Sequence, residues 1–119
     1  MAVDENVTTI ATLPALSVTK AGTSYTQSTP FDRAVGYVAV RVASTAGSIT
    51  VTQQCSIDDT TFYDPVDSSN GALGAIAATM TVGTRYVQYD PVLCPYIRFK
   101  VVEGNVEAST VTITLLVQK

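Results

Sequence analysis

Four aspartates that lie close together in the sequence, Asp58, Asp59, Asp64 and Asp67, are the first residues that could do chemistry. Two carboxylates can act as acid and base on a glycosidic bond when a cleft holds them on either side of the sugar. Carboxylates also bind calcium, but these four do not follow the spacing of an EF-hand loop. Aspartates in a loop more often cap turns by accepting hydrogen bonds from nearby backbone N–H groups, and we expect that role here.

Nucleophilic catalysis is hard to build from this chain, because it contains no histidine. A serine or cysteine nucleophile would have no imidazole base beside it. We therefore expect that the protein is not an enzyme and that it uses no cofactor and no metal ion.

The two cysteines, Cys55 and Cys94, are too far apart in the sequence to match the ligand spacing of a zinc site. Both lie beside expected strands, where a free thiol packs as a small apolar side chain. We favour two buried free thiols. A disulfide between them is the alternative, and it would matter for a protein that meets an oxidising exterior.

Charged residues make up 14% of the chain, and the formal net charge is −3. The basic residues are scattered, whereas a nucleic-acid interface needs them clustered, so we expect no nucleic-acid partner. No apolar run is long enough to cross a bilayer, and residues 1–6 do not resemble a signal peptide, so we expect no membrane association and synthesis in a cytoplasm. The low charged fraction favours a surface covered by neighbours in an assembly, although a threonine-rich soluble sandwich would explain it too.

The elements that must position these residues are strands. Val111, Ile113, Leu115 and Val117 alternate with other residues, and this period of two predicts a strand with one buried face. Leu116 adds an apolar side chain to the opposite face, so we expect a central strand. Threonine and valine are the most frequent residues, and both favour strands.

Further strands are expected at 35–42, 49–55, 62–63, 79–82, 85–89 and 96–101. In the last of these, Ile97, Phe99 and Val101 face inward. The first two runs are joined by a short glycine-containing loop, which is typical of a hairpin. The stretch 66–78 contains a turn at Asn70-Gly71, and its small apolar remainder fits either a short helical turn or a tucked loop.

About eight strands separated by regular turns predict an all-β protein with a single jelly-roll-like β-sandwich. We place the sandwich domain at residues 35–119. Residues 1–34 contain Pro14, Pro30 and Gly22 and have at most short edge strands, so we expect an extended N-terminal arm. The arm would lie over the domain or over a neighbour; a flexible tail is the alternative.

Two runs in the sequence carry a resemblance: Gln54-Cys55-Ser56-Ile57-Asp58-Asp59-Thr60-Thr61-Phe62-Tyr63-Asp64 and Pro95-Tyr96-Ile97-Arg98-Phe99-Lys100-Val101. A strand that ends in Ser-x-Asp-(Gly or Asp)-x-x-Phe, followed by a Tyr-Ile-Arg-Phe strand and a final threonine-rich strand, resembles the discoidin-like or galactose-binding-like jelly roll. The pattern is more closely similar to small tailed-phage virion proteins that carry it behind a short N-terminal arm.

In this pattern Ser56 and Asp58 cap the turn and Phe62 fills the core. The chain has Asp59 where the sugar-binding members usually have glycine, and Phe62 where they often have tryptophan. It also lacks their histidine-containing binding loops, which argues against carbohydrate binding.

The resemblance implies a capsid decoration (cement) protein that binds the capsid exterior, often at local three-fold axes, with the major capsid protein as partner and a homo-oligomer, preferably a trimer, as the assembly. We expect its contacts to come from the arm and from exposed tyrosine and arginine side chains, which are typical of protein interfaces. The candidate interface residues are Leu13, Leu16, Val18, Tyr25, Tyr86, Tyr96 and Arg98. Two alternatives remain, a module that binds glycans or a host surface, and a tail or filament subunit that donates its arm to the next copy.

Overall fold

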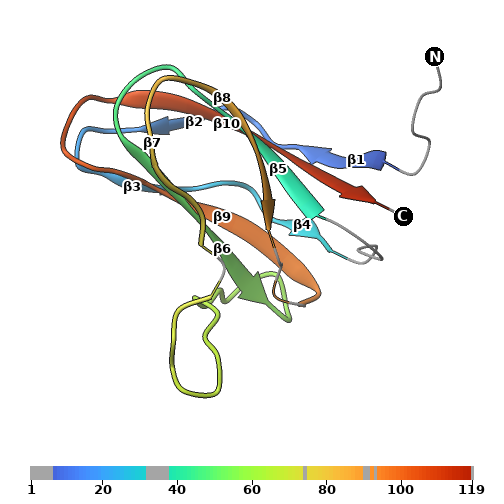
Figure 1. Ribbon diagram of the computed structural model, residues 1–119. Helices are drawn as coiled ribbons and strands as arrows, with labels where there is room; N and C mark the ends of the chain where they lie inside the picture. The colour runs from blue at the N-terminus through green and yellow to red at the C-terminus, as the bar shows by residue number, and fades with distance from the viewer. Residues whose placement is uncertain (1–6, 32–37, 74, 90–91, 93, 119) are drawn as a thin grey trace, which may run out of the picture.

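Figure 1 shows the computed structural model, which describes residues 7–31, 38–73, 75–89, 92 and 94–118. The described residues form strands, turns and loops without a helix, and no helix is therefore available there to cross a membrane. The strands are β1 (Val7–Thr12), β2 (Leu16–Val18), β3 (Thr23–Tyr25), β4 (Thr29–Pro30), β5 (Val38–Ser44), β6 (Ile49–Ser56), β7 (Ala75–Met80), β8 (Gly83–Tyr89), β9 (Tyr96–Glu103) and β10 (Ser109–Gln118).

The strands form two antiparallel sheets that pack face to face, so the expected all-β sandwich is confirmed. One sheet has the order β1-β10-β5-β8, with β2 also on β10, and the other has the order β3-β9-β6-β7, with β4 also on β9. β1 and β2 follow each other along β10, and β3 and β4 follow each other along β9, so each couple acts as one interrupted edge strand. Counted in this way the sandwich has two four-stranded sheets, as in a jelly roll.

The N-terminal region contains the expected short edge strands, and they pair with the protein's own sheets. We expected Leu13 and Val18 to contact a neighbouring molecule. This expectation is wrong, because both side chains are buried in the core between the sheets. Leu16 is half-buried against the same core. The expected boundary between residues 34 and 35 lies outside the described residues.

The expected hairpin between the strands around residues 40 and 50 is wrong. β5 pairs with β10 and β8 in one sheet, whereas β6 pairs with β9 and β7 in the other. The chain crosses between the sheets at Gly47, where φ is +79° and an added Cβ would lie 2.6 Å from the carbonyl oxygen of Glu107. Glycine is needed at this crossing, because other residues would meet both strain and a clash.

The core consists of the inward faces of both sheets. Ile97, Phe99 and Val101 of β9 are buried as expected, and the inward residues of β10 are buried opposite them. β10 lies between β1/β2 and β5, which confirms the expected central strand.

Two expectations for residues 62–78 need correction. Phe62 is half-buried outside the core, and Tyr63 makes an isolated bridge to Cys55 in place of a strand. The turn at Asn70-Gly71 is present. Ala72 and Leu73 lie in the loop after it, whereas the apolar residues from Ala75 on belong to β7 and form neither a helical turn nor a loop.

Candidate functional site

The two ends of the sandwich differ in their connections. At one end, which we call the turn end, short crossings connect β2 to β3, β5 to β6, β7 to β8 and β9 to β10 (Figure 1). At the opposite end, which we call the loop end, the long segment 57–73 follows β6 and reaches away from the sheets (Figure 1). Segments longer than about 12–15 residues without regular strands or helices are uncommon in small domains and are usually either functional or disordered.

The turn end is held by one buried carboxylate. Glu103 is 2% exposed. Its Oε1 accepts N–H groups from Ala21 and Val106, both at 2.9 Å, and its Oε2 accepts that of Ser48 at 3.0 Å. Burial acts to raise the pKa of Glu103, but these backbone donors outweigh it and lower the pKa to about 2. The carboxylate therefore ties three separate crossings together, and all of its bonds serve the fold.

The loop end begins with a tight turn after β6. Oδ1 of Asp58 accepts the backbone N–H groups of Thr60 and Thr61, each at 3.0 Å, and the hydroxyl of Ser56 at 2.9 Å. These donors, with Thr61 contributing most, lower the pKa of the Asp58 carboxyl. Asp59 has φ +61°, a left-handed conformation that aspartate adopts more readily than most residues other than glycine and asparagine. The expected capping by Ser56 and Asp58 is confirmed.

A second capped turn follows in the same loop. Oδ1 of Asp67 accepts the N–H groups of Ser69 and Gly71, both at 2.8 Å, and Asn70 has φ +62°. Among the described residues, which include all four aspartates of the loop, no group of three potential ligands is placed to hold a metal ion. Asp58 and Asp67 shape turns through their hydrogen bonds to backbone N–H groups.

A disulfide joins Cys55 to Cys94 at the loop end, with the two Cα atoms 5.8 Å apart, so our expectation of free thiols is wrong. Cys55 is in β6 and Cys94 precedes β9, and these two strands are neighbours in one sheet. The alternation of residues predicted both strands but did not show that they are adjacent. Behind the bridge, Nε2 of the buried Gln53 donates to the carbonyl oxygen of Val92 at 2.9 Å and helps to hold the segment before β9.

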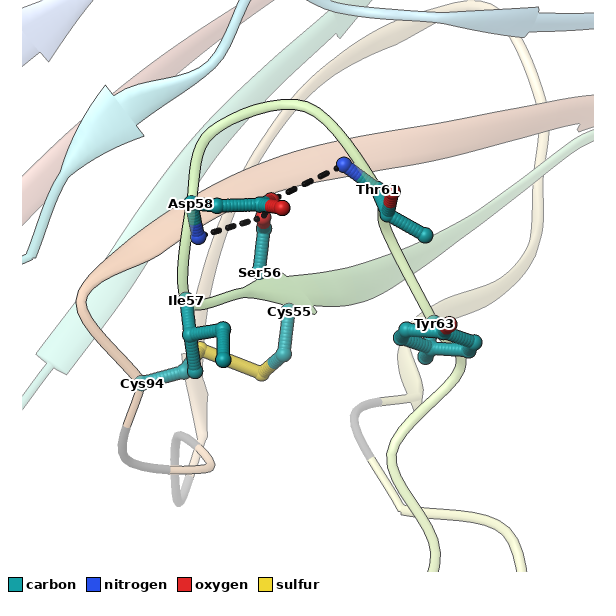
Figure 2. A pocket seen from close by; sticks show the side chains of 7 residues that line it. All are labelled: Cys55, Ser56, Ile57, Asp58, Thr61, Tyr63 and Cys94. Atoms are coloured by element: carbon teal, nitrogen blue, oxygen red, sulfur yellow. Dashed lines mark hydrogen bonds between the residues drawn. A yellow bond between two sulfur atoms is a disulfide. The ribbon is translucent and has the colours of Figure 1, made fainter.

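A hollow of about 390 Å³ opens beside the disulfide. Its lining residues are Cys55, Ser56, Ile57, Asp58, Thr61, Tyr63 and Cys94. Figure 2 shows Ile57 next to the disulfide on one side of the hollow and Tyr63 on the other side of the hollow. Ile57 is 83% exposed and Tyr63 is 69% exposed, so two large apolar surfaces lie open at the rim. The volume suits one side chain or a small ligand.

Exposed apolar side chains are concentrated at this end. Ile57, Tyr63, Val66 and Leu73, all in the segment 57–73, are half of the large exposed hydrophobic residues found in the described part of the chain. Our sequence-based interface set contained none of these four. The length of the segment, with isolated apolar residues in and around two turn motifs, is the signal that could have revealed them.

The predicted interface residues do not form one surface. Tyr25 and Arg98 meet on the outer face of the β3-β9-β6-β7 sheet, and Tyr96 lies two residues from Arg98 on the same side of β9. The Arg98 guanidinium lies 4.2 Å from the ring centroid of Tyr25 and 4.3 Å from that of Phe62. Tyr86 is exposed on β8 of the other sheet, apart from this group.

Arg98 also begins a chain of contacts that attaches the loop to the sheet. Its Nε donates to Oε1 of Gln54 at 2.8 Å, and Nε2 of Gln54 donates to Oδ1 of Asp64 at 2.8 Å. Lys100 is 3.4 Å from the other oxygen of Asp64. The bond from Gln54 is the main cause that lowers the pKa of Asp64. Arg98 therefore positions the segment 57–73.

In comparisons with known proteins, the sequence matches no protein-family model and no curated protein. The function must be inferred from the geometry. The loop end combines an apolar hollow, a rim of exposed apolar side chains, and a loop fixed by two capped turns, a disulfide and the Arg98 contacts.

Proposed function

We propose that this protein is a structural virion protein, a capsid decoration or cement protein that binds the outer surface of the shell through its loop end. The observation that carries the proposal is the concentration of exposed apolar side chains in the segment 57–73, two of which, Ile57 and Tyr63, line the hollow. Contiguous exposed apolar surface on a small soluble domain marks an interaction site. The fixed loop supports this role, since a preorganised surface loses little conformational freedom when it binds.

The partner in this proposal is the major capsid protein. Each bound copy would bury apolar surface worth about 25 cal/mol per Å², before the costs of association are subtracted. Many copies on one particle add their contributions, so a modest gain per site stabilises the whole shell. A trimer around a local three-fold axis is the arrangement that the resemblance implies.

An exterior location is supported by the Cys55–Cys94 disulfide. Disulfides persist in oxidising surroundings and are rare in a reducing cytoplasm. In a chain made in the host cytoplasm, this disulfide would form after the particle leaves the cell. It would then stabilise the conformation of the loop end in the finished virion.

The direct test is co-sedimentation of the purified protein with empty shells assembled from the major capsid protein of the same virus. We expect saturable binding and a higher temperature of shell disassembly. A folded protein that stays in the supernatant even when its concentration is well above that of the shell subunits would contradict the proposal.

A second candidate function is binding of a glycan or host surface. It is favoured by the exposed Tyr63 ring beside the polar side chains of Thr61 and Asp58 in the hollow, because sugar sites combine an aromatic face with hydroxyl and carboxylate partners. A glycan array separates the two functions: saturable sugar binding that is lost in Tyr63→Ala would favour this candidate.

A further inference from the structure

The hollow at the loop end has a chemistry that limits what can enter it. The disulfide and Ile57 form an apolar wall, and the exposed ring of Tyr63 lies across from them (Figure 2). Such a wall accepts the aliphatic part of a side chain. An exposed tyrosine ring also attracts a cation over its face.

Among the described residues that line the hollow, Asp58 is the one charged side chain, and it is negative. Asp59 follows it directly, while the cations of Arg98 and Lys100 lie on the sheet side of the segment, against Phe62 and Asp64. The bonds that cap the turn reach Oδ1 of Asp58, which leaves its second carboxylate oxygen for a further donor. The hollow is therefore complementary to a group that is apolar along its stem and positive at its tip.

The protein contains an example of the same chemistry. On the neighbouring face, the Arg98 guanidinium is held between the rings of Tyr25 and Phe62 and donates to Gln54. An arginine at the hollow would meet similar partners, one tyrosine ring and one side-chain oxygen acceptor.

We propose that the hollow receives an arginine side chain from an apolar segment of the partner protein, with its stem on the disulfide and Ile57, its guanidinium on Tyr63, and a hydrogen bond to Asp58. Arginine fits better than lysine because a planar guanidinium stacks on a ring and donates in a fixed direction to a carboxylate. The inference deepens the proposed function, since it rests on a protein partner at the loop end and names the group that this partner presents.

The test uses four peptides, Gly-Ser-Leu-X-Leu-Ser-Gly with blocked ends, in which X is arginine, lysine, citrulline or glutamate. Citrulline has the shape of arginine without its charge. Each peptide is titrated into the full-length ¹⁵N-labelled protein, and amide shifts are followed by NMR. We expect the arginine peptide to shift residues 55–63 and to bind about tenfold more tightly than the citrulline peptide. Added salt should weaken its binding.

Two matched variants locate the charge. Asp58→Asn keeps an acceptor oxygen for the turn but removes the charge at the hollow, and we expect it to weaken the arginine peptide about tenfold. Asp59→Asn removes the same charge one residue away and tolerates the left-handed conformation, so we expect no more than about a twofold loss. Amide spectra of both variants verify that they are folded.

The inference is overturned if the arginine and citrulline peptides bind equally, if no peptide binds, if the shifts lie outside the loop end, or if both asparagine variants weaken binding alike. The shell experiment is independent of these outcomes. Shell binding without peptide binding would reject the arginine and keep the decoration function. Peptide binding without shell binding would keep the arginine and reject the decoration function.

Discussion

The two ends of the sandwich solve different problems with similar residue types. At the turn end a buried carboxylate, Glu103, accepts backbone N–H groups from three crossings and closes that end of the core. At the loop end the carboxylate of Asp58 accepts backbone N–H groups within a single turn, which leaves Ile57 and Tyr63 exposed above a disulfide. One end uses its polar groups to hold the fold, and the other uses them to shape a surface.

This difference separates stability from binding. Loss of the buried Glu103 contacts at the turn end should destabilise the protein, and changes at the rim of the hollow should leave it folded but unable to bind. The comparison can be tested by variants ordered from the largest expected loss of stability to the smallest.

The largest loss is expected for Glu103→Ala, because it removes a buried carboxylate that accepts part-buried hydrogen bonds from three backbone N–H groups. We expect the Tm to fall by roughly 15 °C. Circular dichroism during heating measures this change. Glu107→Gln, an exposed carboxylate on the same connection, is the matched control and should leave the Tm within a few degrees; an equal loss in both variants would contradict the role of Glu103.

The same carboxylate predicts a dependence on pH. The pKa of Glu103 is about 2 in the folded protein against an ordinary value of 4.5, so its contribution to stability is complete above pH 4.5 and is lost as the pH falls toward 2. We expect denaturant unfolding of the wild type to lose stability over this range more steeply than Glu103→Gln. Parallel curves for the two proteins would show that this carboxylate is not linked to folding.

A smaller loss is expected when the disulfide is removed in Cys55→Ala/Cys94→Ala. The bridge joins residues separated by 39 positions. Closing a loop of this length is worth about 4 kcal/mol for an ideal unfolded chain, and residual structure in the unfolded state reduces the expected loss to about 3 kcal/mol. Urea unfolding should show this loss, and hydrogen exchange should increase at the loop end before the turn end. Uniform faster exchange at both ends would contradict a local role for the bridge.

Arg98→Ala should have a moderate effect, because it removes two ring contacts and the bond to Gln54. We expect a loss of about 1.5 kcal/mol in urea unfolding. Arg98→Lys should recover only part of it, since an ammonium does not stack between two rings as a guanidinium does. Full recovery by lysine would indicate that charge alone matters at this position.

The smallest change in stability is expected for Ile57→Ala/Tyr63→Ala. Both side chains are largely exposed, so truncating them should alter the free energy of unfolding by less than about 0.5 kcal/mol per residue. A larger loss in urea unfolding would mean that the rim belongs to the core after all.

The sequence predicted correctly those features that depend on a single strand. The alternation in β9 and β10 predicted which residues face the core, because a period of two fixes facing without knowledge of partners. It failed for β5 and β6, since a hairpin and a crossing between sheets show the same alternation on either side of Gly47. The disulfide was missed for a similar reason: the pairing of Cys55 with Cys94 depends on the adjacency of β6 and β9.

The candidate site was the least predictable part. Tyr25 was predicted as part of the arm and Arg98 as an exposed arginine, and the two do lie together, but Arg98 is held between two rings and contacts the loop. Isoleucine is a residue type usually found in protein cores. Ile57 is exposed because a capped turn directs the chain away from the sheets.

The most direct measurement is the affinity for shells of the major capsid protein of two matched double variants, each truncating two exposed apolar side chains. Ile57→Ala/Tyr63→Ala changes the loop end, and Val82→Ala/Val106→Ala changes the turn end, where the two valines are 68% and 61% exposed. We expect the loop-end variant to bind at least about tenfold more weakly and the turn-end variant to bind like the wild type. Equal losses in both, or a loss confined to the turn-end variant, would contradict the assignment of binding to the loop end.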